Sequence, residues 1–112
     1  MVKSFSDISK KDFRGLARNI DFLGRLCIPK EFRDALVLTA EDQIAYISCA
    51  DGVLAKPLRW VKPGDLYDFV RHMDSLGRVS IPIDIRKKFG IALHDSVEIF
   101  LLSYGLFIRK NQ

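Results

Sequence analysis

Hydrophobic and polar residues alternate over several short stretches of this chain, a pattern typical of half-buried β-strands. Two longer stretches, Gln43 to Ala50 and Ser96 to Ser103, each precede a second apolar stretch, and we expect both pairs to form hairpins. The partner strands are expected over Val53 to Lys56 and Leu106 to Lys110. Asp51-Gly52 lies between the first pair and favours a type I′ turn, because this dipeptide tolerates positive φ at both central residues. Tyr104-Gly105 separates the second pair.

Two short strands, a glycine turn and a helix are predicted before each hairpin. In the C-terminal half the strands run from Arg71 to Asp74 and from Val79 to Ile81, with a turn at Gly77. A proline directly after the second strand suits the start of a helix, because proline lacks the N–H that is unpaired there. Gly90 suits the end of this helix. The N-terminal half has Val37 at that position, so its helix is expected to end less sharply.

An internal repeat with an offset of 53 residues explains why both halves share these elements. Residues 17–56 align with residues 70–109 without a gap, and ten of the forty pairs are identical. The identical pairs are Arg18/Arg71, Asp21/Asp74, Leu23/Leu76, Gly24/Gly77, Arg25/Arg78, Ile28/Ile81, Pro29/Pro82, Arg33/Arg86, Asp42/Asp95 and Gly52/Gly105. The same L-G-R-x-x-I-P block occurs in both halves, which indicates a duplicated unit of about forty residues.

A β-β-α-β-β unit of this size buries too little apolar surface to fold alone. We therefore expect the two units to interlock around a pseudo-twofold axis and to form one barrel-like core from strands of both. The predicted fold is mainly β with short helices, of the α+β class. Residues 1–16 are a lead-in, residues 17–57 the first repeat (repeat A), residues 58–69 a joint and residues 70–112 the second repeat (repeat B).

The lead-in and the joint lie outside the repeats. The basic residues of the lead-in are Lys3, Lys10, Lys11 and Arg14, and its apolar residues are Phe5, Ile8, Phe13 and Leu16. The apolar residues fall near helical spacing, so we favour a short amphipathic helix, on the barrel or on a second chain, over an extended basic arm. The joint contains a turn signal, Lys62-Pro63-Gly64-Asp65. We expect its Trp60 to pack at the edge of the core rather than stack on a ligand.

Composition favours a single domain with its own core. The chain has 112 residues and a mass of 12.8 kDa, with 48% hydrophobic and 29% charged residues. No apolar run reaches the roughly 18 residues of a membrane span, and the start has no signal-peptide core, so a cytoplasmic protein is expected. A net charge of +4 and a pI near 9.2 favour an anionic partner without defining it.

No metal site or cofactor is predicted. Cys27 and Cys49 lie 22 residues apart, and neither belongs to a Cys-x-x-Cys motif. His72 and His94 add no recognisable ligand spacing. We expect each cysteine to fill a small apolar position in a reducing compartment, and a regulatory disulfide is the less favoured interpretation.

The stretch VRHMDSLGRVSIPIDIRKKF, from Val70 to Phe89, resembles the SpoVT/AbrB-type swapped-hairpin DNA-binding domain family. In repeat B the resemblance continues through Asp95, Val97-Glu98-Ile99 and Arg109-Lys110. Repeat A is a looser match that keeps Arg18, Asp21, Leu23-Gly24-Arg25, Ile28-Pro29-Lys30-Glu31 and Arg33. Together the two repeats cover roughly 80 of the 112 residues. The resemblance implies a swapped-hairpin barrel in a prokaryotic transcriptional regulator, located at the nucleoid, that docks an arginine-bearing strand-and-loop face on DNA.

Double-stranded DNA is accordingly the expected partner, because fixed cations neutralise phosphates and release their counterions. The candidate DNA-binding residues are Arg18, Arg25, Lys30 and Arg33 in repeat A, and Arg71, Arg78, Arg86 and Lys87 in repeat B. Arg25 and Arg78 follow a turn glycine, so exposure and DNA contact are expected for them. Two interpretations stay open for Arg33 and Arg86: DNA contact, or a structural role in which they pair with the turn aspartates or cap a carbonyl.

Repeat B is the more basic half of this predicted interface. Residues 17–37 carry a formal charge of +1 and residues 70–90 carry +3. We therefore expect unequal half-sites, with repeat B contributing more of the binding free energy. A homodimer or higher oligomer is also expected, because regulators of this kind tend to read paired sites.

Other classes of function fit the sequence less well. An enzyme is not predicted, because no nucleophile elbow, phosphate loop or metal pattern surrounds Ser80, His72 and Asp74. The alternative to a regulator is an antitoxin-like or scaffold module that binds a partner protein. A toxin partner is disfavoured, because antitoxins of that sort usually carry a long C-terminal extension, whereas this sequence stops at Gln112.

Overall fold

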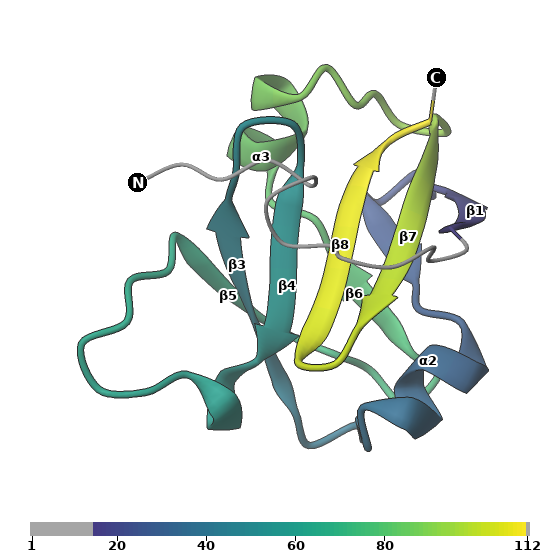
Figure 1. The fold of residues 1–112 in the computed structure, drawn as a ribbon. Coiled ribbons are helices and arrows are strands. Elements are labelled where there is room, and N and C mark those ends of the chain that lie inside the picture. The colour runs from purple at the N-terminus through teal and green to yellow at the C-terminus, as the bar shows by residue number, and fades with distance from the viewer. Residues whose placement is uncertain (1–14, 112) are drawn as a thin grey trace.

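Each half of the chain folds into the same order of elements, with two short strands, a helix and a hairpin (Figure 1). The computed structural model describes residues 15–111. The first half contains β1 (Gly15–Asn19), β2 (Arg25–Cys27), α2 (Lys30–Ala35), β3 (Gln43–Ser48) and β4 (Val53–Pro57). A short 3-10 helix, η1 (Leu58–Trp60), begins the joint. The second half contains β5 (Phe69–His72), β6 (Arg78–Ser80), α3 (Ile83–Lys88), β7 (Ser96–Leu102) and β8 (Gly105–Lys110).

Strands of the two halves interleave in one six-stranded antiparallel sheet, with the order β1-β7-β8-β4-β3-β5. The first strand of each half pairs with the hairpin of the other half, since β1 pairs with β7 and β5 pairs with β3. Strands β2 and β6 pair with each other as a separate two-stranded ribbon. Because β2 also contacts β1 and β6 contacts β5, the ribbon lies between the two edge strands of the sheet. The predicted class, a mainly β swapped-hairpin barrel with short helices, is confirmed.

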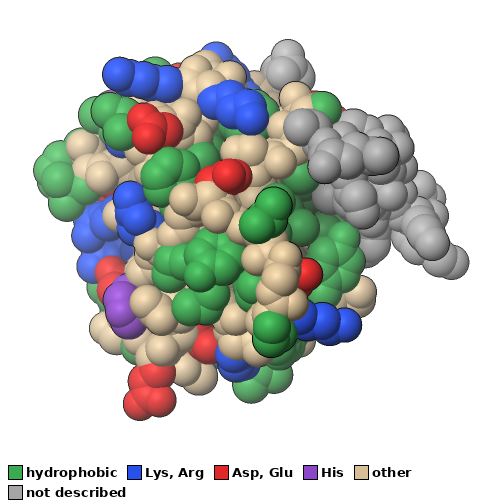
Figure 2. All heavy atoms as spheres, turned by 90° about the vertical axis from the view of Figure 1, so that its left-hand side faces the viewer, with side chains coloured by type: hydrophobic (Ala, Val, Ile, Leu, Met, Phe, Trp, Pro, Cys, Tyr) green, Lys and Arg blue, Asp and Glu red, His purple; other side chains and the backbone are tan. Residues whose placement is uncertain are grey.

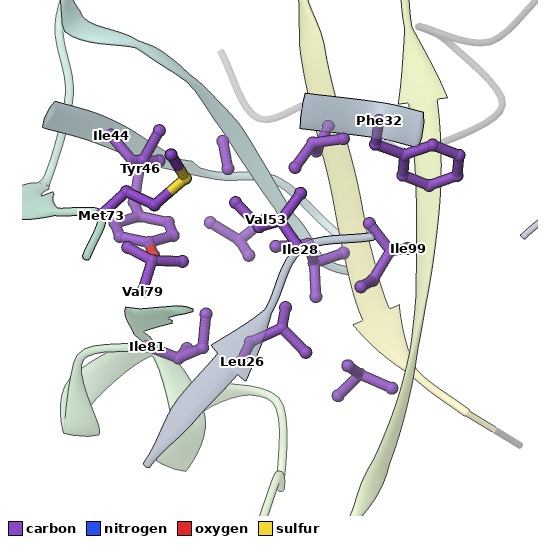
Figure 3. Close-up of a cluster of buried hydrophobic side chains, with 14 of the residues drawn as sticks. Leu26, Ile28, Phe32, Ile44, Tyr46, Val53, Met73, Val79, Ile81 and Ile99 are labelled. Atoms are coloured by element: carbon purple, nitrogen blue, oxygen red, sulfur yellow. The ribbon is translucent and has the colours of Figure 1, made fainter. Parts of the chain in front are cut away.

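The core lies between the ribbon and the sheet and takes side chains from both halves (Figure 3). Leu26 of the ribbon and Ile99 of the sheet are both fully buried there. Tyr46 is also fully buried, and its hydroxyl donates a hydrogen bond to the carbonyl oxygen of Ser80 at 2.8 Å. Burial raises the pKa of the Tyr46 phenol, and the charge of Arg71 opposes this rise only in part. The hydroxyl therefore remains protonated and ties β3 to the ribbon.

The hairpin glycines are required for close packing rather than for a type I′ turn. Neither Asp51 nor Gly52 has a positive φ, so the expected turn type is wrong. The Cys49 N–H donates to the Gly52 carbonyl at 2.9 Å, so the residues between the two paired strands are Ala50 and Asp51 rather than Asp51 and Gly52. A Cβ on Gly52 would lie 2.5 Å from the carbonyl oxygen of Ile108 in β8. A Cβ on Gly105 would likewise lie 2.6 Å from the carbonyl oxygen of Ala55 in β4.

Helices α2 and α3 end at equivalent residues, so the expectation of a less sharply defined end for α2 is wrong. Gly90 follows α3 with a φ of 66°, and Val37 follows α2 with a φ of 54°. A β-branched side chain is strained in this left-handed region. Arg59 of η1 holds this helix end, because its Nη2 donates to the carbonyls of Leu36 and Val37, both at 3.0 Å.

Replacing Val37 with glycine is expected to stabilise the protein by about 0.5–1 kcal/mol. The change removes roughly 1–2 kcal/mol of backbone strain, and the larger backbone entropy of glycine in the unfolded chain offsets part of this gain. The Val37 side chain is 67% exposed, so little packing is lost. Thermal unfolding followed by circular dichroism should give a Tm higher by about 2–8 °C. The matched control Gly90→Val should lower the Tm, and an unchanged Tm in both variants would contradict this explanation.

Two further expectations about apolar residues are corrected. Leu16 lies in β1 and packs partly buried against the core, so it is not part of a helix. The rest of the expected lead-in helix falls on residues 1–14, which lie outside the described residues. Cys49 is buried as expected, but Cys27 is exposed, because it is the outward residue at the end of a ribbon strand.

The joint contains the predicted turn, with the Asp65 N–H donating to the Lys62 carbonyl at 3.0 Å. Trp60 is 37% exposed and is not among the hydrophobic residues buried in the core or packed against it, so the expectation that it packs at the core edge is wrong. The guanidinium carbon of Arg59 lies 5.0 Å from the centroid of its ring, so Arg59 covers part of the indole. Within residues 15–111, no helix is long and apolar enough to cross a membrane.

Candidate nucleic-acid interface

The β2–β6 ribbon turns one face to the core and the other to solvent. The central residue of each strand is buried, so the residues on either side of it point outward by the alternation of a strand. Arg25 pairs with Ser80, and Cys27 pairs with Arg78. The outward face therefore carries two arginines at diagonal corners, with Cys27 and Ser80 at the other two.

A tight turn precedes each ribbon strand and positions its arginine. In repeat A the Oδ1 of Asp21 accepts hydrogen bonds from the N–H groups of Leu23 at 2.9 Å and Arg25 at 2.8 Å. The Oδ2 accepts a third bond from the Nε of Arg25 at 2.8 Å. Asp74 accepts the equivalent three bonds from Leu76 and Arg78 in repeat B. A carboxylate that accepts two backbone bonds and one guanidinium bond makes each turn rigid.

Arg25 and Arg78 are half-buried rather than fully exposed. Their side chains are 25% and 35% exposed, because each lies along its aspartate partner. Only the Nε of each guanidinium takes part in the pairing, which leaves both Nη nitrogens without a partner among residues 15–111. This fork is suited to bidentate contact with a phosphate or with a guanine edge.

Arg33 and Arg86 each reach the turn of the opposite repeat. The Nε of Arg33 donates to the carbonyl of Ile28 at 3.0 Å, so the carbonyl-capping interpretation holds, and pairing with the turn aspartates is wrong. The guanidinium also lies against Gly77, where a Cβ would come within 2.5 Å of its Nε. Arg86 repeats both contacts in the other half and lies against Gly24. Each turn glycine thus makes room for an arginine from the other repeat.

These contacts bring the arginines together as two pairs, each drawn from both repeats. One pair is Arg25 with Arg86, which lies against the neighbouring Gly24, and the other is Arg78 with Arg33, which lies against the neighbouring Gly77. The two turns lie at opposite ends of the antiparallel ribbon. They are separated by four residues along one strand, which corresponds to roughly 14 Å. The short ribbon therefore has two arginines near each of its ends.

The other candidate residues lie around the ribbon. Arg18 and Arg71 are exposed on the flanking edge strands β1 and β5, and the Nη1 of each donates to the preceding carbonyl at 2.8 Å. Lys30 pairs with Asp34 at 2.9 Å on α2, and Lys87 is exposed in the last turn of α3. No contact joins either lysine to the arginine pairs within residues 15–111.

Sequence reasoning missed the remaining residues of this surface. Cys27 and Ser80 complete the outward face of the ribbon, and the alternation from Arg25 onward would have identified them. Phe22 and Leu23 project from the apex of the repeat A turn. Among residues 15–111, no three His, Cys, Asp or Glu side chains are placed to hold a metal ion.

The face formed by β3, β5 and the joint differs from the ribbon. In Figure 2, hydrophobic side chains gather over the middle of this face, and Lys and Arg side chains are spread along its margins. Leu66 and Tyr67 of the joint are 86% and 45% exposed. The centre of this face is therefore apolar, unlike the arginine-lined ribbon.

Hydrogen bonds within the two turns stabilise the ionised form of Asp21 and of Asp74. Burial acts to raise the pKa of Asp21, but hydrogen bonds from the backbone and guanidinium of Arg25 outweigh it, so the pKa lies below its usual value. The pKa of Asp74 is also lowered, and the backbone hydrogen bond from Arg78 is the largest cause. Both aspartates are therefore expected to be ionised at neutral pH.

Because these pKa values are lower in the folded chain, the unfolded chain binds protons first as the pH falls. The aspartates therefore stabilise the fold fully above pH 3.8, and this stabilisation is lost as the pH falls through the lower folded pKa. We expect the double variant Asp21→Asn/Asp74→Asn to show a weaker dependence of stability on pH in this acidic range than the native chain. Urea unfolding at a series of pH values measures it, and identical pH profiles would contradict the assignment.

No protein-family model and no solved structure matches this chain. The chain is 44% identical over 41 residues to the transition state regulatory protein AbrB of Bacillus subtilis (strain 168), which covers 37% of this chain and 43% of AbrB. It is 39% identical over 41 residues to the putative transition state regulator Abh of the same organism, covering 37% of this chain and 45% of Abh. The matched segment resembles AbrB-like regulators. Its length is about that of one repeat, and the chain spans less than half the length of either relative.

Proposed function

We propose that this protein binds double-stranded DNA through the outward face of the β2–β6 ribbon and acts as a prokaryotic transcriptional regulator. The arginine pairs at the two ends of this exposed ribbon carry the proposal. A two-stranded ribbon fits the major groove of B-DNA, which is about 12 Å wide. The local similarity to two proteins named as regulators supports the same function and argues against an enzyme.

In this proposal the arginines have different roles in DNA binding. Arg25 and Arg78 enter the groove with the ribbon, where their Nη nitrogens reach phosphates or guanine edges. Arg33 and Arg86 add charge at the same corners, and Arg18 and Arg71 contact the backbones on either side. If the protein touches about six phosphates, log K is expected to fall with log salt at a slope near −5.

The proposal also gives the two repeats unequal shares of the binding free energy, although each end of the ribbon carries an arginine from both repeats. Repeats A and B are tandem AbrB-like copies, related by a pseudo-twofold that matches the local twofold of a duplex. Repeat B is the stronger half, because Lys30 of repeat A is neutralised by Asp34, whereas repeat B has Lys87 and Lys88 near the end of its helix. A cytoplasmic location at the nucleoid follows from this function.

Protection of the Cys27 thiol from alkylation by bound DNA tests which face of the protein the DNA covers. Cys27 is exposed on the ribbon face, whereas Cys49 is buried and serves as an internal control. A duplex at about ten times its Kd is expected to slow alkylation of Cys27 about tenfold, because only the free protein reacts. Mass spectrometry of the alkylated protein gives both rates.

A thiol introduced away from the ribbon distinguishes protection of Cys27 by bound DNA from a general effect of DNA on the alkylation reaction. In a Cys27→Ser background, Leu66→Cys places an exposed thiol in the joint, away from the ribbon. This thiol should react equally fast with and without DNA. Equal alkylation of Cys27 with and without bound DNA would remove the ribbon from the interface.

A further inference from the structure

The turn next to each end of the ribbon holds apolar side chains in solvent. In repeat A, Phe22 is 66% exposed and Leu23 is 58% exposed. In repeat B, Leu76 is 62% exposed and Ser75 takes the place of Phe22. The two ends of the ribbon therefore have the same backbone and the same arginines, but differ in apolar surface.

The turn itself keeps Phe22 and Leu23 outward. The Gly24 N–H donates to the Asp21 carbonyl at 3.0 Å, so the two apolar residues occupy the centre of a β-turn. The Leu23 N–H is also bound to the Asp21 carboxylate at 2.9 Å. With both backbone positions held, the side chains cannot fold back onto the core without breaking these bonds.

The same turn carries part of the proposed interface. Arg25 follows it directly, and the guanidinium of Arg86 lies against Gly24 within it. A duplex that receives the ribbon and this arginine pair must also meet the apex of the turn. The major-groove edges of the bases offer one apolar group, the 5-methyl of thymine.

We propose that Phe22, with Leu23 beside it, contacts thymine methyl groups in the major groove and makes repeat A prefer A·T pairs at its end of the site. The inference rests on the proposed DNA-binding function. Repeat B offers Leu76 alone and contributes a weaker preference. The site is therefore asymmetric in apolar contact: both ends of the ribbon carry one arginine from each repeat, but only the repeat A turn adds a phenylalanine.

Uracil-containing DNA isolates this contact, because it lacks the 5-methyl group and leaves the minor groove and the phosphates unchanged. Fluorescence anisotropy is measured on two short alternating duplexes, one of A·T pairs and one of A·U pairs. The native chain is expected to bind the thymine duplex about fourfold tighter for each methyl group that it buries. Phe22→Ser introduces the residue type that repeat B has at this position, and it should bring the ratio of the two affinities towards one.

Leu66→Ser is the matched control, since it removes an 86% exposed apolar side chain from the joint. This variant should keep the native ratio of affinities. A Phe22→Ser variant that also keeps the native ratio would overturn the inference, as would a native chain that binds both duplexes equally. In those two cases DNA binding itself stands. A native chain that binds neither duplex at low salt would remove the proposed function together with the inference.

Discussion

Replacing Arg25 and Arg78 together with alanine is expected to weaken binding to a mixed-sequence duplex about 100-fold at 0.1 M salt. Each residue supplies a bidentate fork, and loss of two such contacts at roughly 1–3 kcal/mol each accounts for this change. The slope of log K against log salt should also become shallower by about two, because two cations are removed. Fluorescence anisotropy over a salt series measures both quantities.

The control for this variant removes the same charge elsewhere. Lys56→Ala/Lys62→Ala lowers the net charge equally, with one change in β4 and one in the joint. Circular dichroism should show that both variants stay folded, because partly exposed ion pairs such as Arg25–Asp21 contribute little stability. Equal weakening by both variants would mean that net charge, rather than the ribbon, governs binding.

The single variants test whether the half-sites are unequal. If repeat B contributes more of the binding free energy, Arg78→Ala should lose more affinity than Arg25→Ala. Their environments are closely matched, since each pairs with a turn aspartate at 2.8 Å. Equal losses would show that the halves bind alike, despite the difference in charge between α2 and α3.

Neither half of the chain is expected to fold as a monomer when it is produced alone. Within residues 15–111, strand β1 finds its sheet partner in β7 and β5 finds its partner in β3, so each half lacks a neighbour for its first strand. The ribbon is lost as well, because β2 pairs with β6. Separate fragments 1–57 and 58–112 should lack the circular dichroism of native β-structure, and mixing them should restore a cooperative unfolding transition.

Concentration dependence separates the possible outcomes for the fragments. A fragment that folds as a homodimer, with a Tm that rises with concentration, agrees with an interlocked unit that needs a second copy. A fragment that folds cooperatively as a monomer would contradict the exchange of strands between halves. Because the intact chain carries both halves, its Tm should depend on concentration less strongly than that of a dimeric fragment.

The sequence alone determined the order of elements and the need for two copies. Strand and helix periods are local properties, so residues 43–48 and 83–88 were assigned correctly from neighbouring residues. The turn glycines were also identified, because Gly24 and Gly77 have positive φ values that other residues adopt at a cost. The repeat of 53 residues then led to a shared core, since one unit buries too little apolar surface.

Only the tertiary structure decided which side chains meet. Arg25 and Arg33 both lie in repeat A, yet Arg25 bonds to its own turn whereas Arg33 lies against the turn of repeat B. The requirement for glycine at position 52 also depends on another strand, because a Cβ there would clash with the backbone of β8. Such contacts join residues that are distant in sequence, and the strand exchange that brings them together leaves no local period. The positions of the arginines could therefore be predicted, but their pairing at the two ends of the ribbon could not.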